Sequence, residues 1–301
     1  MHSTYKMLPA IVILSFLLMI TTSVAPKANA AAKVIKDIEF AKVQDQSLKL
    51  DLYLPSKPKG SALVVWIHGG GWRKGNKGKC FITWLPEHGY AVASISYRFS
   101  STAKFPAQLH DCKGAVRWLR ANAKKYGYDP DKFYVAGASA GGHLTALMAT
   151  TSGHEKLEGT VGGNLKQSST VQGAIDYYGP TDFVLRSRTQ PSRANEKGSV
   201  VYDLLGGGAH EEIEAAKLAS ACYHVSKDDA PLLVLHGNSD KTVLIDQSKA
   251  IAAAYRKMGL PVEFHVIDGA GHGGNVFYSG ENATRLLNFL KKHTQQPEER
   301  K

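Results

Sequence analysis

The chain has 301 residues, of which 43% are hydrophobic and 21% charged, and its formal net charge is +11. This length and composition indicate a globular protein with a full core, and α/β folds of this size commonly form one domain. The positive charge favours anionic surroundings, but the sequence has no zinc-ligand spacing and no basic-aromatic repeat, so we expect no nucleic-acid partner.

The first thirty residues have the pattern of an export signal. Lys6 precedes an apolar stretch from Leu8 to Ile20, and the small residues Ala28 to Ala30 offer a cleavage site for a signal peptidase. The apolar stretch is too short for a stable membrane span. We expect residues 1–30 to be removed and the protein to be secreted or periplasmic; retention as an uncleaved anchor is the alternative. Cleavage would remove two lysines and no acidic residue, which lowers the charge from +11 to about +9.

Residues 31–301 are expected to form a single α/β domain. Two alternating runs between Val34 and Pro55 predict antiparallel edge strands. The later apolar runs are continuous, which is typical of parallel strands covered on both faces. These runs begin at Ala62, Tyr90, Phe133, Val171, Ala230 and Val262. Because helical patterns separate them, we predict a doubly wound, mostly parallel sheet that binds ligands at the carboxyl ends of its strands.

Two polar stretches interrupt the alternation, one from Ser152 to Ser169 and one from Val184 to about Gly208. We interpret both as insertions above the sheet. The second is either a mobile loop or a cap that shapes the substrate site, and its polar, basic composition favours the loop. A short helix is expected after it, around His210 to Ser220.

One serine stands among small residues where a strand is followed by a helix. Residues 135–144 read VAGASAGGHL, with Ser139 in the middle. Small side chains are needed where the backbone turns sharply and another segment passes close by. Strand, tight turn and helix in this order predict a nucleophile elbow, which exposes Ser139 Oγ above the sheet. An ordinary glycine-rich turn is the alternative.

A serine hydroxyl needs a base within hydrogen-bond reach and an acid that orients the base. His272 follows the last predicted strand and Asp240 follows the strand before it, which gives the chain order Ser, Asp, His of this fold. Ester or amide hydrolysis also needs donors for the oxyanion, and we assign the N–H groups of Gly70, Gly71 and Ala140 to that role. This chemistry requires no metal and no organic cofactor.

Other polar residues compete for these roles. Asp182 also follows a strand, but an aspartate after Pro-Thr is more often a helix or turn cap. Asp246 lies inside a helical pattern. Four histidines are expected to be structural or to border the site: His68 as a brace of the glycine loop, His143 at a helix start, and His236 and His265 within strands.

Side chains near the expected site entrance are candidates for substrate contact. Trp72 is the preferred substrate-binding residue, followed by Tyr178, although core packing explains Tyr177 and Tyr178 equally well. A basic cluster follows the glycine loop and is either a solvated face or an attractor of acidic substrates; it consists of Arg73, Lys74, Lys77 and Lys79.

Three widely spaced cysteines are expected to be buried structural residues rather than catalytic thiols. They are Cys80, Cys112 and Cys222, and none lies in a CxxC motif. An exported protein could pair two of them, and the sequence leaves open which pair forms, if any. The oligomeric state is also left open.

Four motifs in this order resemble those of a known family. They are HGGGW, the segment around VAGASAGGHL, DYYGPTDF and APLLVLHGNSDKTV. These motifs are similar to those of the α/β-hydrolase serine esterases of the hormone-sensitive-lipase-like and bacterial feruloyl and acetyl-xylan esterase groups. The resemblance covers roughly Leu50 to His293.

The resemblance implies the α/β-hydrolase fold and a serine carboxylic-ester hydrolase, with the triad carried over to Ser139, Asp240 and His272. The implied substrates are short-acyl or aromatic esters, among them those of plant polysaccharides. Ala138 departs from the pattern, because many relatives have an acidic or another side chain there, and this bears on substrate preference. The alternatives are a serine peptidase of the same fold, which would usually carry a large extra domain, and a non-catalytic binding module.

Overall fold

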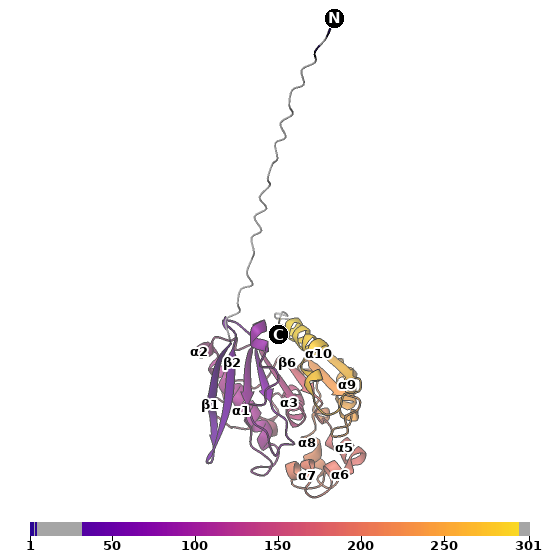
Figure 1. Cartoon of the computed structure of the whole chain (residues 1–301). Coiled ribbons are helices and arrows are strands. Elements are labelled where there is room, and N and C mark those ends of the chain that lie inside the picture. The colour runs from indigo at the N-terminus through magenta and orange to yellow at the C-terminus, as the bar shows by residue number, and fades with distance from the viewer. Residues whose placement is uncertain (3, 5–31, 295–301) are drawn as a thin grey trace.

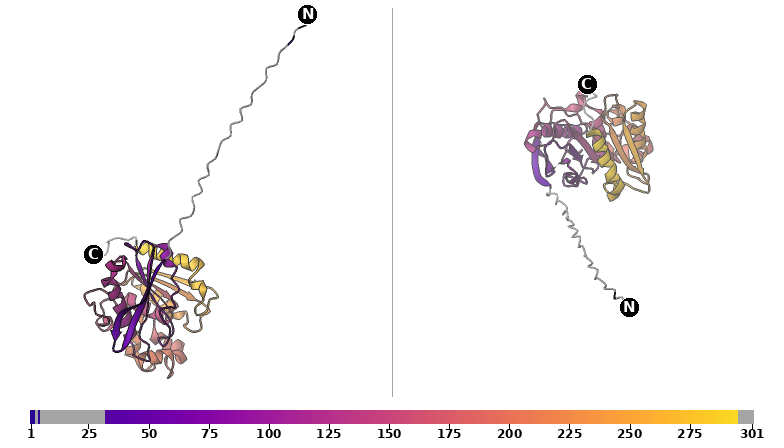
Figure 2. Two further views of the ribbon diagram at one scale, coloured as in Figure 1. Left: turned by 60° about the vertical axis from the view of Figure 1, so that its left-hand side comes forward. Right: turned by 90° about the horizontal axis from the view of Figure 1, so that it is seen from above.

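The computed structural model describes residues 1, 2, 4 and 32–294, so nearly all of the expected export signal lies outside the described residues. An eight-stranded sheet lies between helices on both faces (Figures 1 and 2). Its order is β1-β2-β4-β3-β5-β6-β7-β8. The strands are β1 (Lys33–Val43), β2 (Gln46–Leu54), β3 (Leu63–Ile67), β4 (Ala91–Ile95), β5 (Phe133–Ala138), β6 (Gly173–Tyr177), β7 (Leu232–Gly237) and β8 (Val262–Ile267).

The pairing of the strands confirms the predicted fold class. Strands β3 to β8 are mutually parallel, whereas β1 pairs antiparallel with β2 and β2 antiparallel with β4. Only β1 of the two antiparallel strands is an edge strand, because β2 is bonded on both sides. The carboxyl ends of the parallel strands therefore lie at one end of the sheet, where the α/β fold places ligands.

Ten α-helices and three short 3₁₀ helices connect the strands within the part of the chain that the structure describes. The α-helices are α1 (Ala107–Ala121), α2 (Ala123–Tyr126), α3 (Ala140–Thr150), α4 (Glu155–Glu158), α5 (Phe183–Thr189), α6 (Pro191–Ala194), α7 (Val200–Leu205), α8 (Ile213–Leu218), α9 (Asp246–Lys257) and α10 (Gly280–Thr294). The 3₁₀ helices are η1 (Leu85–His88), η2 (Ala221–Tyr223) and η3 (Asn275–Phe277). None of the described helices combines the length and apolarity needed to cross a bilayer.

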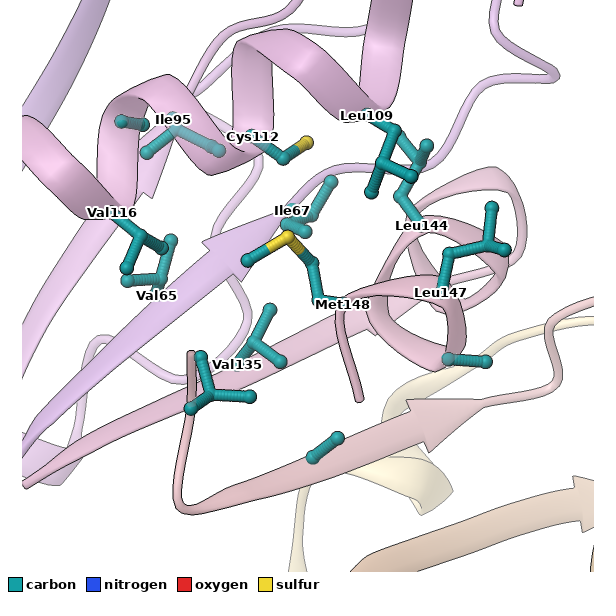
Figure 3. Close-up of a cluster of buried hydrophobic side chains, with 14 of the residues drawn as sticks. Val65, Ile67, Ile95, Leu109, Cys112, Val116, Val135, Leu144, Leu147 and Met148 are labelled. Atoms are coloured by element: carbon teal, nitrogen blue, oxygen red, sulfur yellow. The ribbon is translucent and has the colours of Figure 1, made fainter. Parts of the chain in front are cut away.

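The core has two parts because side chains alternate between the faces of each strand. On β3, Val65 and Ile67 join the cluster on the face of α1 and α3, whereas Val64 and Trp66 join the cluster beside α10. Figure 3 shows the first cluster, in which α1 and α3 pack side chains onto the sheet. Both faces of the central strands are buried, which explains their continuous apolar runs.

The first polar insertion is not above the sheet at the ligand end. It follows the carboxyl end of α3 and leads into the start of β6, and α3 runs back from the site end of β5. The two ends of the insertion therefore lie at the amino ends of the strands, but its middle part packs along α1, where His110 Nε2 lies 3.1 Å from the Lys156 carbonyl and Arg117 donates to the Val161 carbonyl at 3.1 Å. There Glu158 of α4 forms an ion pair with the buried Lys113 of α1 at 2.6 Å. The predicted position above the sheet is wrong, because the segment packs against α1 and none of its residues lines the cavity beside the strand ends.

The second insertion is helical, so the preference for a mobile loop is wrong. Helices α5, α6 and α7 occupy it, and α8 follows within the predicted helical range. Asp182 caps α5 by accepting a hydrogen bond from Leu185 N–H, and Ser199 caps α7. The buried side chains of Phe183, Val201 and Leu204 join the main core, which holds these short helices in place.

Candidate active site

Ser139 occupies a sharp turn between β5 and α3. Its backbone has φ +56° and ψ −116°, a conformation that costs energy for a residue with a side chain. The turn is held on both sides, because Ser139 N–H donates to the carbonyl of Tyr177 and the Ser139 carbonyl accepts from His143 N–H, both at 2.9 Å. The hydroxyl therefore stands at the carboxyl end of the sheet, at the start of a helix.

The glycines around Ser139 are required by close approach of other segments. A Cβ on Gly137 would lie 2.6 Å from the carbonyl carbon of Gly141, and one on Gly142 would lie 2.9 Å from Gly179 Cα. A Cβ on Gly141 would lie 2.7 Å from the carbonyl carbon of Ile67 at the end of β3. Such distances are shorter than real Cβ contacts, so the turn between β5 and α3 packs closely only because these positions lack side chains.

The structure brings Ser139, His272 and Asp240 together in one hydrogen-bonded line. His272 Nε2 lies 2.8 Å from Ser139 Oγ, and His272 Nδ1 lies 2.6 Å from Asp240 Oδ2. The three residues follow β5, β8 and β7, whose carboxyl ends meet at the same edge of the sheet. If Nδ1–H donates to the carboxylate, Nε2 is free to accept the hydroxyl proton, as a general base must.

Asp240 is buried but surrounded by donors. Its Oδ1 accepts hydrogen bonds from the N–H groups of Thr242, at 2.8 Å, and Val243, at 3.0 Å. Burial raises the pKa of the carboxyl, but the hydrogen bonds from His236 and His272 and the charge of His272 outweigh it and hold the pKa well below its ordinary value. The carboxylate is therefore ionised at neutral pH and can stabilise a protonated His272.

His236 is a neighbour of the site that sequence reasoning assigned to the core alone. Its Nδ1 lies 2.6 Å from the hydroxyl of Ser248, and its Nε2 lies 2.9 Å from the carbonyl of Val243 and 3.2 Å from Asp240 Oδ2. An Nε2–H that donates to both oxygens fits this environment. The side chain is structural, as expected, but it also contacts the acid. The only sequence signal is its position four residues before Asp240.

The glycine loop after β3 has an unusual backbone. Gly70, Gly71 and Trp72 have φ values of +119°, +61° and +56°, and the Gly70 carbonyl accepts from the N–H groups of Arg73 and Lys74 at 3.2 Å. Among the described residues, no acceptor pairs with the N–H groups of Gly70, Gly71 or Ala140. These residues line the same cavity as Ser139, so their N–H groups are available to a ligand.

His68 braces this loop, as the sequence predicts. Its ring is buried and stacks on Tyr97 with 4.4 Å between the ring centroids, and its Nδ1 lies 2.7 Å from the Gly69 carbonyl. Burial lowers the pKa of the imidazole, which is therefore neutral at pH 7. The ring supports the loop from behind.

A cavity of about 1140 Å³ opens beside Ser139 and His272. Phe81 and Tyr278 line it and stack on each other at 4.6 Å, and Phe81 is 47% exposed. An exposed aromatic ring beside a nucleophile is suited to contact with a planar or apolar part of a ligand. Sequence reasoning missed both residues, although Tyr278 follows His272 by only six positions.

The structure corrects the expected stacking role of Trp72. The residue is only 1% exposed, and its ring packs edge-on against His143 and Phe183 at 5.1 and 5.8 Å. It belongs to the core under the cavity and offers no free aromatic face. Tyr178 is also buried, at 4% exposed; its ring contacts His272 at 4.9 Å and its hydroxyl is hydrogen-bonded to that of Tyr278. Tyr178 therefore supports the His272 ring.

The profile of the BD-FAE family matches residues 50–255. The chain belongs to the BD-FAE family. Among curated proteins, it is 28% identical over 79% of its length to Esterase LipC and 31% identical over 69% to the Probable carboxylic ester hydrolase LipM, both of Mycobacterium tuberculosis. The matches cover 60% and 50% of these relatives, so this BD-FAE member spans little more than half of their length.

Two solved structures resemble this BD-FAE protein closely. One is titled a truncated form of a carbohydrate esterase from gut microbiota; the TM-score is 0.80 at 28% identity, covering 90% of this chain and 99% of the other. The second is a bifunctional GH43-CE protein of Bacteroides eggerthii, with a TM-score of 0.80 at 32% identity, covering 87% and 35% of the two chains. These similarities confirm the resemblance to α/β-hydrolase esterases.

The rival candidates lie away from the nucleophile. Asp182 is the cap of α5, which confirms the structural explanation of this residue. Asp246 is the first residue of α9. His265 lies on β8, and none of these three lines the cavity. The three cysteines are unpaired in the described structure, and burial raises the pKa of each thiol, which disfavours the thiolate that a nucleophile needs.

His143 is buried behind the site rather than at its border, and this makes stability depend on pH. Its Nε2 lies 2.7 Å from the carbonyl of Ala219, and burial is the main cause that lowers its pKa to about 4. An unfolded histidine binds a proton near pH 6.5, so between pH 6.5 and 4 the unfolded state binds more protons than the folded state. The free energy of unfolding should therefore fall on acidification, by about 1.4 kcal/mol per pH unit for this group.

We expect His143→Gln to have a shallower fall of unfolding free energy between pH 6.5 and 4.5 than the unmodified protein. Urea unfolding at several pH values measures both slopes. His88→Gln is the control, because it makes the same substitution at an exposed position. Equal slopes for His143→Gln and the unmodified protein would show that folding does not lower the pKa of His143.

Proposed function

We propose that this protein is an exported serine carboxylic-ester hydrolase that acts through an acyl-enzyme on short-acyl or aromatic esters, including those of plant polysaccharides. The observation that carries the proposal is the hydrogen-bonded line from Ser139 through His272 to Asp240, which opens into a large cavity beside unpaired N–H groups. Export rests on the signal pattern of residues 1–30.

The proposed reaction has two acyl-transfer steps. Ser139 Oγ attacks the ester carbonyl carbon while His272 Nε2 takes the hydroxyl proton. The carbonyl oxygen becomes an oxyanion and accepts hydrogen bonds from the N–H groups of Gly70, Gly71 and Ala140. The C–O bond to the alcohol then breaks as His272 returns the proton to the leaving oxygen.

Deacylation repeats these steps with water as the nucleophile. His272 removes a proton from water, the resulting tetrahedral adduct collapses, and the acid leaves as Ser139 regains its proton. Asp240 stays ionised throughout, because its hydrogen bonds keep its pKa low, and it stabilises the imidazolium form of His272. The protein groups alone complete this cycle.

Two observations support the substrate class. Relatives and neighbours of this chain are esterases, and the two similar structures are described as a carbohydrate esterase and a GH43-CE protein. The exposed ring of Phe81, which stacks on the buried Tyr278, lines the cavity beside the triad and can pack against a sugar or an aromatic acyl group.

Hydrolysis of acetyl, butyryl, long-chain and feruloyl esters tests the proposal. We expect kcat/KM to be highest for the acetyl or feruloyl esters, and Ser139→Ala to lose the activity while retaining its circular dichroism spectrum. A Ser139→Ala protein that still hydrolyses these esters would remove the assigned nucleophile. A wild-type protein that hydrolyses none of them would contradict the esterase function itself.

A further inference from the structure

The cavity beside Ser139 is lined by cations without any carboxylate. Among the described residues, no aspartate or glutamate lines it, whereas five basic side chains do: Arg73, Lys74, Lys79, Arg186 and Arg193. Clefts lined by charges of one sign concentrate ligands of the opposite sign. The lining therefore favours a ligand that carries negative charge.

The predicted basic cluster contributes only part of this lining. Lys77 turns away from the cavity and forms ion pairs with Asp37 and Asp51, at 2.8 and 2.7 Å. Arg73 is paired with Asp203 at 2.8 Å, so its charge is compensated. The sequence offered two interpretations of the basic cluster, a solvated face or an attractor of acidic substrates. Neither describes the whole cluster, because some members are paired with carboxylates and others are not.

Three of the other cations have no compensating carboxylate. Lys74, Lys79 and Arg193 are exposed, and within the described chain none of them forms an ion pair. Exposed charges of this kind contribute little to stability. Their field, however, attracts anions toward the opening of the cavity.

Arg186 differs from these three because it is buried. It lies on α5, in the insertion that covers the site, and is only 2% exposed. Its Nη2 donates to the Thr242 carbonyl at 2.7 Å, and its Nε has no partner among the described residues. Burial, with the charge of Arg193 second, lowers its pKa to about 10, although the charges of Asp240 and Asp246 act in the opposite direction, so it remains charged at neutral pH.

A buried guanidinium has five N–H donors and normally meets a carboxylate or several acceptors. Arg186 has one backbone acceptor and no ion pair with a described residue. The carboxylates of Asp240 and Asp246 act on this charge through space, but neither accepts a hydrogen bond from it. Leaving buried N–H donors without an acceptor is costly, and such a cost is retained where a ligand supplies the missing partner. The residue lines the cavity of the triad, and its partner Thr242 donates its own N–H to Asp240.

We propose that the esters hydrolysed at this site carry a free carboxylate, which Arg186 binds while the ester group lies at Ser139. The inference rests on the proposed esterase function and specifies its substrate class. A guanidinium binds a carboxylate through charge-assisted hydrogen bonds, which are stronger than neutral ones. Lys74, Lys79 and Arg193 draw the anionic ester to the cavity, and Arg186 holds it there.

A purely structural role of Arg186 makes a different prediction from carboxylate binding. Through the Thr242 carbonyl, Arg186 also braces the loop that carries Asp240. Loss of a brace would slow the hydrolysis of charged and neutral esters alike. Loss of a carboxylate partner would slow the charged ester and leave the neutral ester nearly unchanged. The ratio of the two rates separates the roles.

Two matched pairs of esters provide this ratio. In 3-acetoxybenzoate and 3-acetoxybenzamide the carboxylate or its neutral amide is on the leaving alcohol, and in monophenyl adipate and phenyl adipamate it is on the acyl group. We expect the wild-type protein to favour the carboxylate in at least one pair by about tenfold to a hundredfold in kcat/KM, the range of one hydrogen bond to a charged group.

Arg186→Gln should abolish this preference, so that the ratio of kcat/KM for the carboxylate and the amide falls to about one, whereas any loss through the contact with the Thr242 carbonyl would slow both esters equally and leave the ratio unchanged. Arg188→Gln is the matched control, because this substitution removes the same charge from an exposed position on the same helix, and Arg188 does not line the cavity. Arg186→Lys should retain part of the preference. Equal rates for carboxylate and amide in both pairs with the wild-type protein, or an unchanged preference in Arg186→Gln, would overturn the inference.

The remaining outcomes are also decisive. If Arg186→Gln does not fold, the wild-type ratio decides, and a preference that shrinks as NaCl rises supports the inference. Calorimetric binding of 3-acetoxybenzoate to Ser139→Ala separates the two proposals. Binding that depends on Arg186, without any hydrolysis by the wild-type protein, would contradict the esterase function and support the anionic ligand. Hydrolysis without a carboxylate preference would contradict only the inference.

Discussion

His272→Ala is expected to lower kcat for ester hydrolysis by a factor on the order of 10⁴ to 10⁶, with little change in folding. His272 Nε2 lies 2.8 Å from Ser139 Oγ and is the only base that contacts it among the described residues. Without this group, the hydroxyl keeps its proton during attack, and the leaving alcohol receives none. Both halves of the reaction lose their proton carrier.

Steady-state kinetics on an acetyl ester measure the loss, with His265→Ala as the matched control. His265 lies on β8, seven residues before His272, and does not line the cavity. The control should retain kcat within about twofold, because the half-buried side chain of His265 does not line the cavity that holds the nucleophile. Retention of more than a tenth of the activity in His272→Ala would show that another group acts as the base.

Asp240 acts on the transferred proton only through His272. The loss of kcat caused by removing Asp240 should therefore not add to the loss caused by removing His272. Asp240→Asn alone is expected to lower kcat by about 10⁴, because it no longer fixes the tautomer of the ring. Combined with His272→Ala, it should cost almost nothing further, since residues that act as a unit are not additive. The contact of His236 with Asp240 Oδ2 fixes the same carboxylate from the other side.

The positions of the triad residues could be predicted from sequence because they depend mainly on where the parallel strands end. In a parallel sheet, residues that directly follow strands all lie at one edge, and Ser139, Asp240 and His272 each do so. The glycines beside Ser139 also had a local cause, the close approach of β3 and α3. The structure brings the three side chains together, and their catalytic roles remain our proposal.

The residues that surround a substrate could not be predicted in the same way. Trp72 and Phe81 are both aromatic residues near the glycine loop, yet one is buried under the cavity and the other exposed in it. Which of them faces a ligand depends on the packing of distant segments such as α5. Helices α5, α6 and α7 are too short to form on their own propensity and are held by buried side chains.

Arg186 illustrates the same limit. In the sequence it is one of several arginines in a polar insertion, and nothing in the spacing distinguishes it from Arg188. Only the fold shows that one is buried beside the triad and the other exposed. The first insertion is a different case. Its position after a helix and before a parallel strand required only its two ends to lie at the amino ends of the strands, and its packing along α1 could not be predicted from that position.

Gly141→Ala is expected to destabilise the protein by more than about 4 kcal/mol, or to prevent folding, which is among the largest effects of single substitutions. The added Cβ would overlap the Ile67 carbonyl and lie 2.8 Å from the carbonyl oxygen of His68. Both atoms are backbone, in β3 and at the start of the glycine loop, so no side-chain rotation can relieve the clash. The helix or the loop would have to move.

Urea unfolding, or the soluble yield where the variant does not fold, measures this effect. Gly78→Ala is the control, because its Cβ would meet only the side-chain oxygen of the exposed Asn76, and we expect a change within about 0.5 kcal/mol. A Gly141→Ala protein as stable as the wild type would mean that α3 and the glycine loop can separate without cost. The N–H groups of Gly70 and Gly71 would then not be held against Ser139 by packing, and the oxyanion site would have to form only when substrate binds.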